Sequence, residues 1–200
     1  MMCRKLRLWS LVALCCNASL AFAQAAQFAG YGVDIGVAHN RVSDHIEDGS
    51  TDRENATNFI IHGRYATPLS DKVLLGLGAR FNLSNADIHS GADYQDQTRN
   101  EAGLAVELGY ALSNKTLLYG KVGYETAQFA FQNPSLVLTR SLHGIGYGAG
   151  IRYLIKPHWY TQLELSRKDF NQIAWDCGAA QPCQDDISHT AASIAIGYQF

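Results

Sequence analysis

The chain has 200 residues, of which 47% are hydrophobic and 17% are charged, and its formal net charge at pH 7 is −2. With a sequence pI near 6.4, it lacks the basic footprint typical of nucleic-acid-binding proteins. A mean hydropathy of −0.11 is too low for a bundle of transmembrane helices. Its 18 glycines follow no collagen-like period and only 4 prolines are present, which excludes collagen and Pro-rich disorder. The length fits one domain.

The first 23 residues have the three-part layout of a secretory signal peptide. Three basic residues occur among the first seven, an apolar run follows, and Ala21-Phe22-Ala23 supplies the small-x-small cleavage pattern. The apolar run is shorter than the ~20 residues that a membrane-spanning helix needs, which disfavours an uncleaved anchor. We therefore expect a cleaved signal peptide over 1–23 and a single mature domain over 24–200.

Two cysteines, Cys177 and Cys183, belong to the mature part of the chain. An even pair in an exported protein predicts a disulfide, because export leads to an oxidising compartment. A metal centre would need further ligands at matched spacing, and only Asp176, Asp185 and Asp186 lie nearby. The sequence therefore favours a disulfide over a metal site.

The mature sequence alternates apolar residues with small or polar ones at a period of two, which is the signal of β-strands. The alternation occurs in eight segments, near residues 31–38, 59–65, 73–83, 102–110, 118–125, 145–153, 159–166 and 190–200. Strands that span a membrane take ~9–11 residues, so eight of them use roughly half of the mature chain. An eight-stranded barrel has a lumen just wide enough for side chains, which argues against a diffusion porin.

The alternation fits a soluble sandwich with its apolar face inward, or a membrane barrel with its apolar face toward lipid. The lengths of the connections favour the membrane barrel. Short joins are expected near 67–72, 113–115 and 155–158, and long polar connections near 43–56, 85–100, 130–140 and 169–186. Short periplasmic turns opposite long external loops are typical of outer-membrane barrels.

The two parities of the strands carry different residues, as a membrane barrel requires. Aromatic residues of the apolar parity lie beside the short turns and are expected to form a periplasmic girdle: Tyr31, Tyr65, Tyr110, Tyr153, Trp159 and Phe200. The polar parity carries charges of both signs, which would cost ~2–4 kcal/mol each at mid-depth if they faced hydrocarbon. We expect these to form an interior charge network: Arg64, Arg80, Glu107, Lys121, Glu125, Arg152 and Glu164. The network is interpreted as structural, with a narrow ion path as the alternative.

Alternate glycines from Gly144 to Gly150 share the inward parity of their strand. We expect them to make room for Tyr119 and Tyr160, which would reach inward from neighbouring strands. The run is not a nucleotide-binding loop, because the strand alternation continues through it and no helical pattern follows.

The stretch from Gly146 to Tyr153, followed by Pro157-His158-Trp159 and Glu164, resembles the small outer-membrane β-barrel superfamily, which includes opacity-type, Ail/OmpX-type and OmpA-barrel proteins. The ending Tyr198-Gln199-Phe200 resembles the C-terminal aromatic signal that is read by the barrel assembly machinery. The resemblance implies an all-β fold, an eight-stranded antiparallel transmembrane β-barrel in the outer membrane of a Gram-negative bacterium. It does not imply one role, since members of the superfamily differ in function.

The resemblance also covers enzymes, because some small outer-membrane barrels of this kind act on the lipid A of lipopolysaccharide. The deacylase type needs a His-x-Ser pair, and none of the seven histidines is followed by serine two residues later. A palmitoyltransferase-like site would need outer-loop residues, for which Asp44, His45, His89 and Ser90 are the candidates. We expect no enzyme activity and no cofactor. The first alternative is a lipid A-modifying enzyme, and the second is a soluble, lipocalin-like periplasmic ligand binder.

The first external connection is acidic. A solvated loop is the simplest interpretation, and a divalent cation site that bridges to lipopolysaccharide is the alternative, since oxygen-rich loops suit Ca²⁺ or Mg²⁺. The residues concerned are Asp44, Glu47, Asp48, Asp52 and Glu54, beside Arg53.

The sequence predicts an envelope-structural or surface-interaction protein, serving adhesion or resistance, whose specificity lies in four long external loops. The expected partners are outer-membrane lipid and lipopolysaccharide, a host or surface ligand at the loops, and the barrel assembly machinery through Phe200. We expect a monomer and no nucleic-acid partner.

Overall fold

The computed structural model describes residues 23–46, 51–90, 95–133, 136–171, 173–175 and 183–200, and within this part no helix is long and apolar enough to cross a membrane. Side chains are described from residue 24 onward, outside 44–52, 86–96, 131–138 and 172–186. A four-residue helix precedes ten strand segments: α2 (Ala23–Ala26), β1 (Gly30–Ile46), β2 (Thr51–Pro68), β3 (Val73–Asn82), β4 (Ala86–Ser90), β5 (Gln95–Ser113), β6 (Thr116–Asn133), β7 (Leu136–Lys156), β8 (Trp159–Phe170), β9 (Ile173–Trp175) and β10 (Cys183–Gln199).

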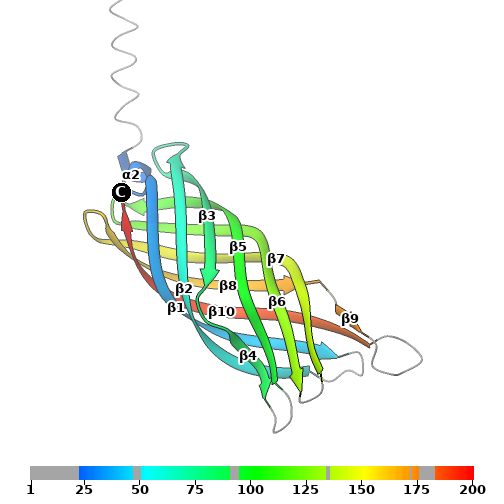
Figure 1. Ribbon diagram of the computed structural model, residues 1–200. Helices are drawn as coiled ribbons and strands as arrows, with labels where there is room; N and C mark the ends of the chain where they lie inside the picture. Colours follow the sequence, from blue (N-terminus) through cyan, green and yellow to red (C-terminus); the bar gives the residue numbers. More distant parts are fainter. Residues whose placement is uncertain (1–22, 47–50, 91–94, 134–135, 172, 176–182) are drawn as a thin grey trace, which may run out of the picture.

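The strand segments form one closed antiparallel barrel (Figure 1). β4 pairs with β5 beyond the end of β3, and β9 pairs with β10 beyond the end of β8, so each short segment continues a longer one. The first and last strands pair over Gly32–Ile46 of β1 and Asp185–Gln199 of β10, which closes the sheet. The prediction of an eight-stranded antiparallel barrel is therefore confirmed.

The register of the strands determines the width of the barrel. A row of paired residues that starts at Tyr31 passes round the wall through Leu77, Val122 and Arg167 and returns to β1 at Arg41, ten residues further along. Ten residues at ~3.3 Å, set against eight strand separations of ~4.8 Å, give a strand tilt of about 40° and a radius of about 8 Å. A lumen of this radius holds side chains and little else.

The strands continue far beyond the predicted segments at the end opposite the short turns. β5 has 19 residues and β7 has 21, whereas a membrane-spanning strand needs only ~9–11. The short connections agree with prediction, but the prediction of four long loops is wrong. Most of the first three segments expected to be loops, and half of the fourth, is strand. The residues between the strand ends, 47–50, 91–94, 134–135 and 176–182, lie outside the described part. Backbone pairing persists beyond the membrane, where polar residues are tolerated on both faces.

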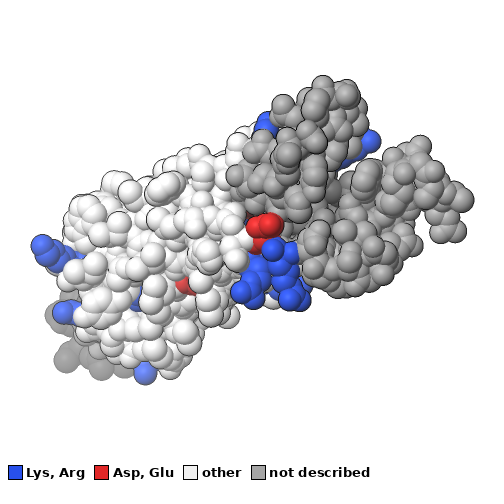
Figure 2. All heavy atoms as spheres, turned by 90° about the horizontal axis from the view of Figure 1, so that it is seen from below, with Lys and Arg blue, Asp and Glu red and all other residues white. Residues whose placement is uncertain are grey.

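The exterior of the barrel is apolar over a broad band. Large apolar side chains of the alternating parity point outward, and Ile35, Leu77 and Leu104 are 58%, 61% and 66% exposed. Figure 2 shows a wall with few charged atoms between its ends, and lysine and arginine atoms gathered toward both ends. Apolar surface of this extent is typical of a barrel that faces hydrocarbon.

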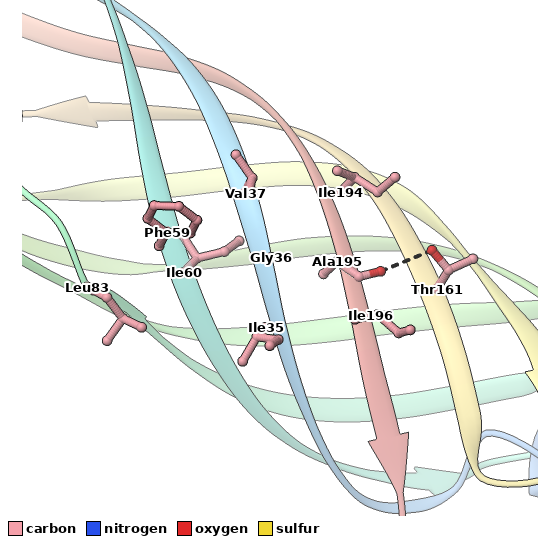
Figure 3. Close-up of a pocket in the computed structure, with 10 residues that line it drawn as sticks. All are labelled: Ile35, Gly36, Val37, Phe59, Ile60, Leu83, Thr161, Ile194, Ala195 and Ile196. Carbon is pink, nitrogen blue, oxygen red and sulfur yellow. Dashed lines mark hydrogen bonds between the residues drawn. The ribbon is translucent and has the colours of Figure 1, made fainter.

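An apolar groove runs along the outer wall where β1 and β10 meet (Figure 3). Gly36 and Ala195 have little or no side chain at its floor, and larger apolar side chains stand on either side of them. Thr161 Oγ1 donates to the carbonyl oxygen of Ala195 at 3.0 Å, so this hydroxyl is paired with the wall. The groove therefore presents almost only hydrocarbon to its surroundings.

Two interior tyrosines are accommodated by glycines, one of them by a glycine that the sequence did not indicate. A Cβ added to Gly150 would collide with the Tyr119 ring, as expected, but the ring of Tyr160 lies against Gly197 of β10. Gly146 lies beside Glu125 instead of a tyrosine. The expectation that the glycine run makes room for Tyr160 is thus wrong. The space for this ring comes from Gly197 on the last strand, β10.

We expect Gly150→Ala to lower the free energy of unfolding by ~1–3 kcal/mol, because the added methyl group must displace Tyr119 in a filled lumen. Gly120→Ala, on the lipid-facing side of β6, is the matched control, since its Cβ would meet only the carbonyl oxygen of Gly148, at 3.9 Å. Guanidinium unfolding in phospholipid vesicles measures both variants. Equal midpoints for the two would contradict this packing.

Candidate functional site

The described lumen contains five acidic and five basic side chains, together with His62 and His189. The acidic residues are Asp34, Glu101, Glu107, Glu125 and Glu164, and the basic ones are Arg64, Arg80, Lys121, Arg152 and Lys168. All seven residues of the predicted charge network lie here. Sequence reasoning missed Asp34, Glu101 and Lys168. The last two lie just outside the predicted strands near 102–110 and 159–166, so they were assigned neither to a strand nor to a connection.

Arg152 is the most deeply buried charge, with a side chain that is 0% exposed. Its Nη1 donates to Glu107 Oε1 at 2.9 Å and its Nη2 to Glu107 Oε2 at 3.1 Å. Its Nε donates to Gln162 Oε1 at 3.0 Å, and its guanidinium carbon lies 4.8 Å from the centre of the Tyr119 ring. This two-bond pairing matches the planar guanidinium to the carboxylate and holds β7 in register with β5 across the lumen.

A second ion pair joins β6 to β8. Lys121 Nζ lies 2.8 Å from Glu164 Oε1, and the Tyr119 hydroxyl donates to Glu164 Oε2 at 3.0 Å. Both carboxylate oxygens of Glu164 therefore have a partner, and Tyr119 links this pair to the guanidinium of Arg152.

The outermost charges form a cluster around Glu101. Arg80 Nη2 donates to Glu101 Oε1 at 2.8 Å and to Glu125 Oε2 at 2.7 Å. Lys168 also donates to Glu101 Oε1, and His189 Nδ1 lies 3.7 Å from Glu101 Oε2. One cluster thus connects side chains of β3, β5, β6, β8 and β10.

The charges around Asp34 and Arg64 are arranged differently. Tyr160 donates its hydroxyl to Asp34 Oδ2 at 2.8 Å, and His62 Nδ1 lies 3.3 Å from the same oxygen. Arg64 makes no ion pair with a carboxylate among the described residues. Its Nη2 donates to the side-chain oxygen of Gln199 at 3.0 Å.

An apolar layer closes each end of this charged region. The turn-end layer contains Ala25, Phe28, Ala66, Leu74, Ala111 and Leu117, and the outer layer contains Val42, Ala127, Leu142, Phe170 and Ile187. Sequence reasoning missed both layers. The turn-end layer had a visible signal, because adjacent apolar pairs at Leu74-Leu75 and Leu117-Leu118 interrupt the strict alternation.

The six predicted girdle residues all lie on the exterior near the turn end. Along a strand, each residue rises ~2.5 Å in the direction of the barrel axis, and each step to the paired residue on the next strand rises ~3 Å. With these rises, the six residues lie within about 6 Å of one another along the barrel axis. Tyr31 and Tyr65 have ring centroids 4.8 Å apart, and Tyr198 contacts both Trp159, at 5.4 Å, and Phe200, at 5.2 Å. The level of these rings is where a membrane–water interface would favour aromatic side chains.

Several predicted residues cannot be placed. Cys177 lies outside the described residues, as does the side chain of Cys183, so the disulfide stays a prediction. The same applies to the side chains of Asp44, Asp52, His45, His89 and Ser90, and to Glu47 and Asp48. Among the described residues, no group of three or more His, Cys, Asp or Glu side chains could hold a metal ion.

Removing one partner of the Arg152–Glu107 ion pair should lower the free energy of unfolding far more than removing both partners. Arg152→Met leaves the Glu107 carboxylate buried without its cation, and we expect a loss of ~3–5 kcal/mol in the free energy of unfolding. The double variant R152M/E107L should recover most of that loss, because no unpaired charge remains. Unfolding midpoints of both single variants and the double variant, measured in vesicles, give the coupling between the two residues. Losses that simply add would contradict the pairing.

Comparisons with known proteins agree with this architecture. A family model described as "Outer membrane protein beta-barrel domain" matches residues 9–200. No curated protein sequence matches the chain. Ail, the attachment invasion locus protein of Yersinia pestis, solved in complex with the heparin analogue sucrose octasulfate, is 16% identical with a TM-score of 0.61, covering 86% of this chain and 99% of Ail.

Two further solved structures are similar. Neisserial surface protein A is 10% identical, with a TM-score of 0.58 and coverage of 86% of this chain and 98% of that one. OprG of Pseudomonas aeruginosa is 16% identical, with a TM-score of 0.52 and coverage of 86% and 96%. At these identities the likeness shows the fold alone. The family match excludes the soluble, lipocalin-like alternative. The chain belongs to the outer membrane protein β-barrel domain family and is located in the outer membrane of the Gram-negative cell envelope.

Proposed function

We propose that this protein is a non-enzymatic, monomeric barrel that serves the envelope as a structural and surface-interaction scaffold, in adhesion or resistance, and acts through its outer strand tips. The observation that carries the proposal is the filled lumen. Five acidic and five basic side chains are held between two apolar layers. All five acidic side chains have a basic or histidine partner in the lumen, which favours a role in holding the strands in register over a role in transport or catalysis.

The outer strand tips are the part of the molecule best suited to meet partners. Arg41, Arg53, Arg140 and Arg167 are exposed there, and Glu54 is exposed beside them. Arg41 and Arg167 flank Thr190 in one row on the exterior, at the outer edge of the apolar band. Basic side chains at this level suit the phosphate groups of lipopolysaccharide, and those further out suit a sulfated or otherwise anionic surface ligand.

The opposite end suits contact with the assembly machinery. Phe200 is 72% exposed, and its backbone N–H donates to the carbonyl oxygen of Tyr31 at 2.9 Å, which fixes it beside the closing seam of the barrel. An exposed aromatic terminus at the seam supports the proposal that Phe200 is read during insertion into the membrane.

A binding experiment tests the role of the tips. We expect the reconstituted protein to bind immobilised heparin, and the double variant R53E/R140E to bind roughly 3–10-fold more weakly, because two cations become anions at the outer end. The control is K115E/K156E, which makes the same change in net charge at the short turns. The proposal of an anionic ligand is wrong if the wild type does not bind, or if both variants lose affinity equally.

Mass spectrometry of lipid A from cells with and without the protein tests the enzymatic alternative. We expect identical profiles, since the sequence contains no His-x-Ser pair and the described interior carboxylates Glu107, Glu125 and Glu164 are held in ion pairs. A mass change of one acyl chain in the cells that contain the protein would make it a lipid A-modifying enzyme.

A further inference from the structure

We propose that residues 24–29 are a plug that closes the turn end of the barrel, and that the amino group created by processing before Gln24 fastens this plug to Asp71. The amino-group part rests on the cleavage site that the sequence predicts. The plug itself goes beyond the proposed function and does not depend on it.

The chain folds inward at the point where β1 begins. Gly30 has a φ of +101°, in the region that favours glycine, and a Cβ there would lie 3.1 Å from the carbonyl oxygen of Phe200. α2 therefore lies at the turn end of the barrel, beside the C-terminus (Figure 1). The backbone N–H of Ala25 donates to the carbonyl oxygen of Asp71 in the β2–β3 turn at 2.8 Å.

The segment buries apolar side chains in the mouth of the lumen. Ala25 and Phe28 are both 0% exposed. They pack against inward-facing residues near the turn end of four strands, Ala66, Leu74, Ala111 and Leu117. Each of these four strands thus contributes an apolar residue where a polar lumen would otherwise meet the periplasm. Such a contact layer is expected only if the segment normally occupies this place.

Two polar side chains from the wall bind the backbone of the segment. Arg64 Nη1 donates to the carbonyl oxygen of Phe28 at 3.2 Å. Gln199 Nε2 donates to the carbonyl oxygens of Ala29 at 2.7 Å and Gln27 at 3.0 Å, and its side-chain oxygen accepts from Arg64. Because Arg64 makes no carboxylate ion pair in the described part, the segment supplies one of the oxygens that this buried cation needs.

Processing changes the chemistry of the contact with Asp71. The backbone nitrogen of Gln24 lies 3.4 Å from Asp71 Oδ1. In the precursor this nitrogen is a neutral amide, and cleavage before Gln24 converts it into an ammonium group facing a carboxylate. Charge-assisted hydrogen bonds are about twice as strong as neutral ones, so removal of the leader strengthens the plug.

Hydrogen exchange of the peptide that covers 24–30, measured on the processed protein in vesicles, tests the plug. We expect slow exchange in the wild type and at least a tenfold increase in Phe28→Asp, which cannot keep its side chain in the apolar layer. Gln27→Ala is the matched control and should exchange like the wild type, because this side chain is exposed and residue 27 is bound through its backbone N–H and carbonyl oxygen. If Phe28→Asp does not fold, Phe28→Ala replaces it. Fast exchange in the wild type overturns the plug.

Acylation of the terminal amine tests its pairing with Asp71. The intact mass should show that the chain starts at Gln24, and another start overturns the amino-group part. We expect Asp71→Asn to be acylated roughly 2–5-fold faster at pH 7, because the amine has lost its carboxylate. The control Asp169→Asn, at the other end of the barrel, should react like the wild type. Equal rates in all three proteins overturn the pairing while leaving the exchange result and the binding of heparin to stand on their own.

Discussion

The ten-residue offset at which the sheet meets itself is the constraint on which the rest of the structure depends. It gives a radius of about 8 Å, so the lumen is a packed interior that excludes bulk water. A charged side chain there needs an oppositely charged side chain on another strand, and a large aromatic ring needs space left by a small residue. The forked pair of Arg152 with Glu107, at 2.9 and 3.1 Å, satisfies the first requirement, and the glycines beside Tyr119 and Tyr160 satisfy the second.

The membrane-embedded part of this architecture could be predicted from sequence because hydrocarbon imposes a strict rule. Each residue there faces either lipid or lumen, so outward apolar residues such as Ile35 and Leu77 alternate with inward small or polar residues such as Asp34 and Gly78. The short turns could be predicted for a related reason, because the alternation of apolar and polar residues stops abruptly at segments such as Ser113 to Lys115. The eight strand positions and the seven interior charges were accessible in this way.

The rest was not accessible, because the same rule fails where hydrocarbon ends. Beyond the membrane both faces of a strand tolerate polar residues, so β5 and β7 resemble loops in sequence while their backbones remain paired. Glu101 and Lys168 belong to the lumen but stand where the alternation fades. Phe28 precedes the first strand, and its position depends on the bend at Gly30. It also depends on the backbone carbonyl oxygens of 28–29, which accept hydrogen bonds from Arg64 and Gln199. These contacts join residues far apart in the sequence, so the alternation pattern does not predict them.

The continuation of the strands past the membrane has a mechanical consequence. β1 extends five residues beyond Arg41 and β7 begins seven residues before His143, so the paired rim projects roughly 12–18 Å from the outer edge of the apolar band. A rim made of hydrogen-bonded strands is stiffer than unpaired loops would be. It holds the described strand ends at a fixed height beyond the apolar band, and binding of a partner to paired strands costs less conformational entropy than ordering a flexible segment would.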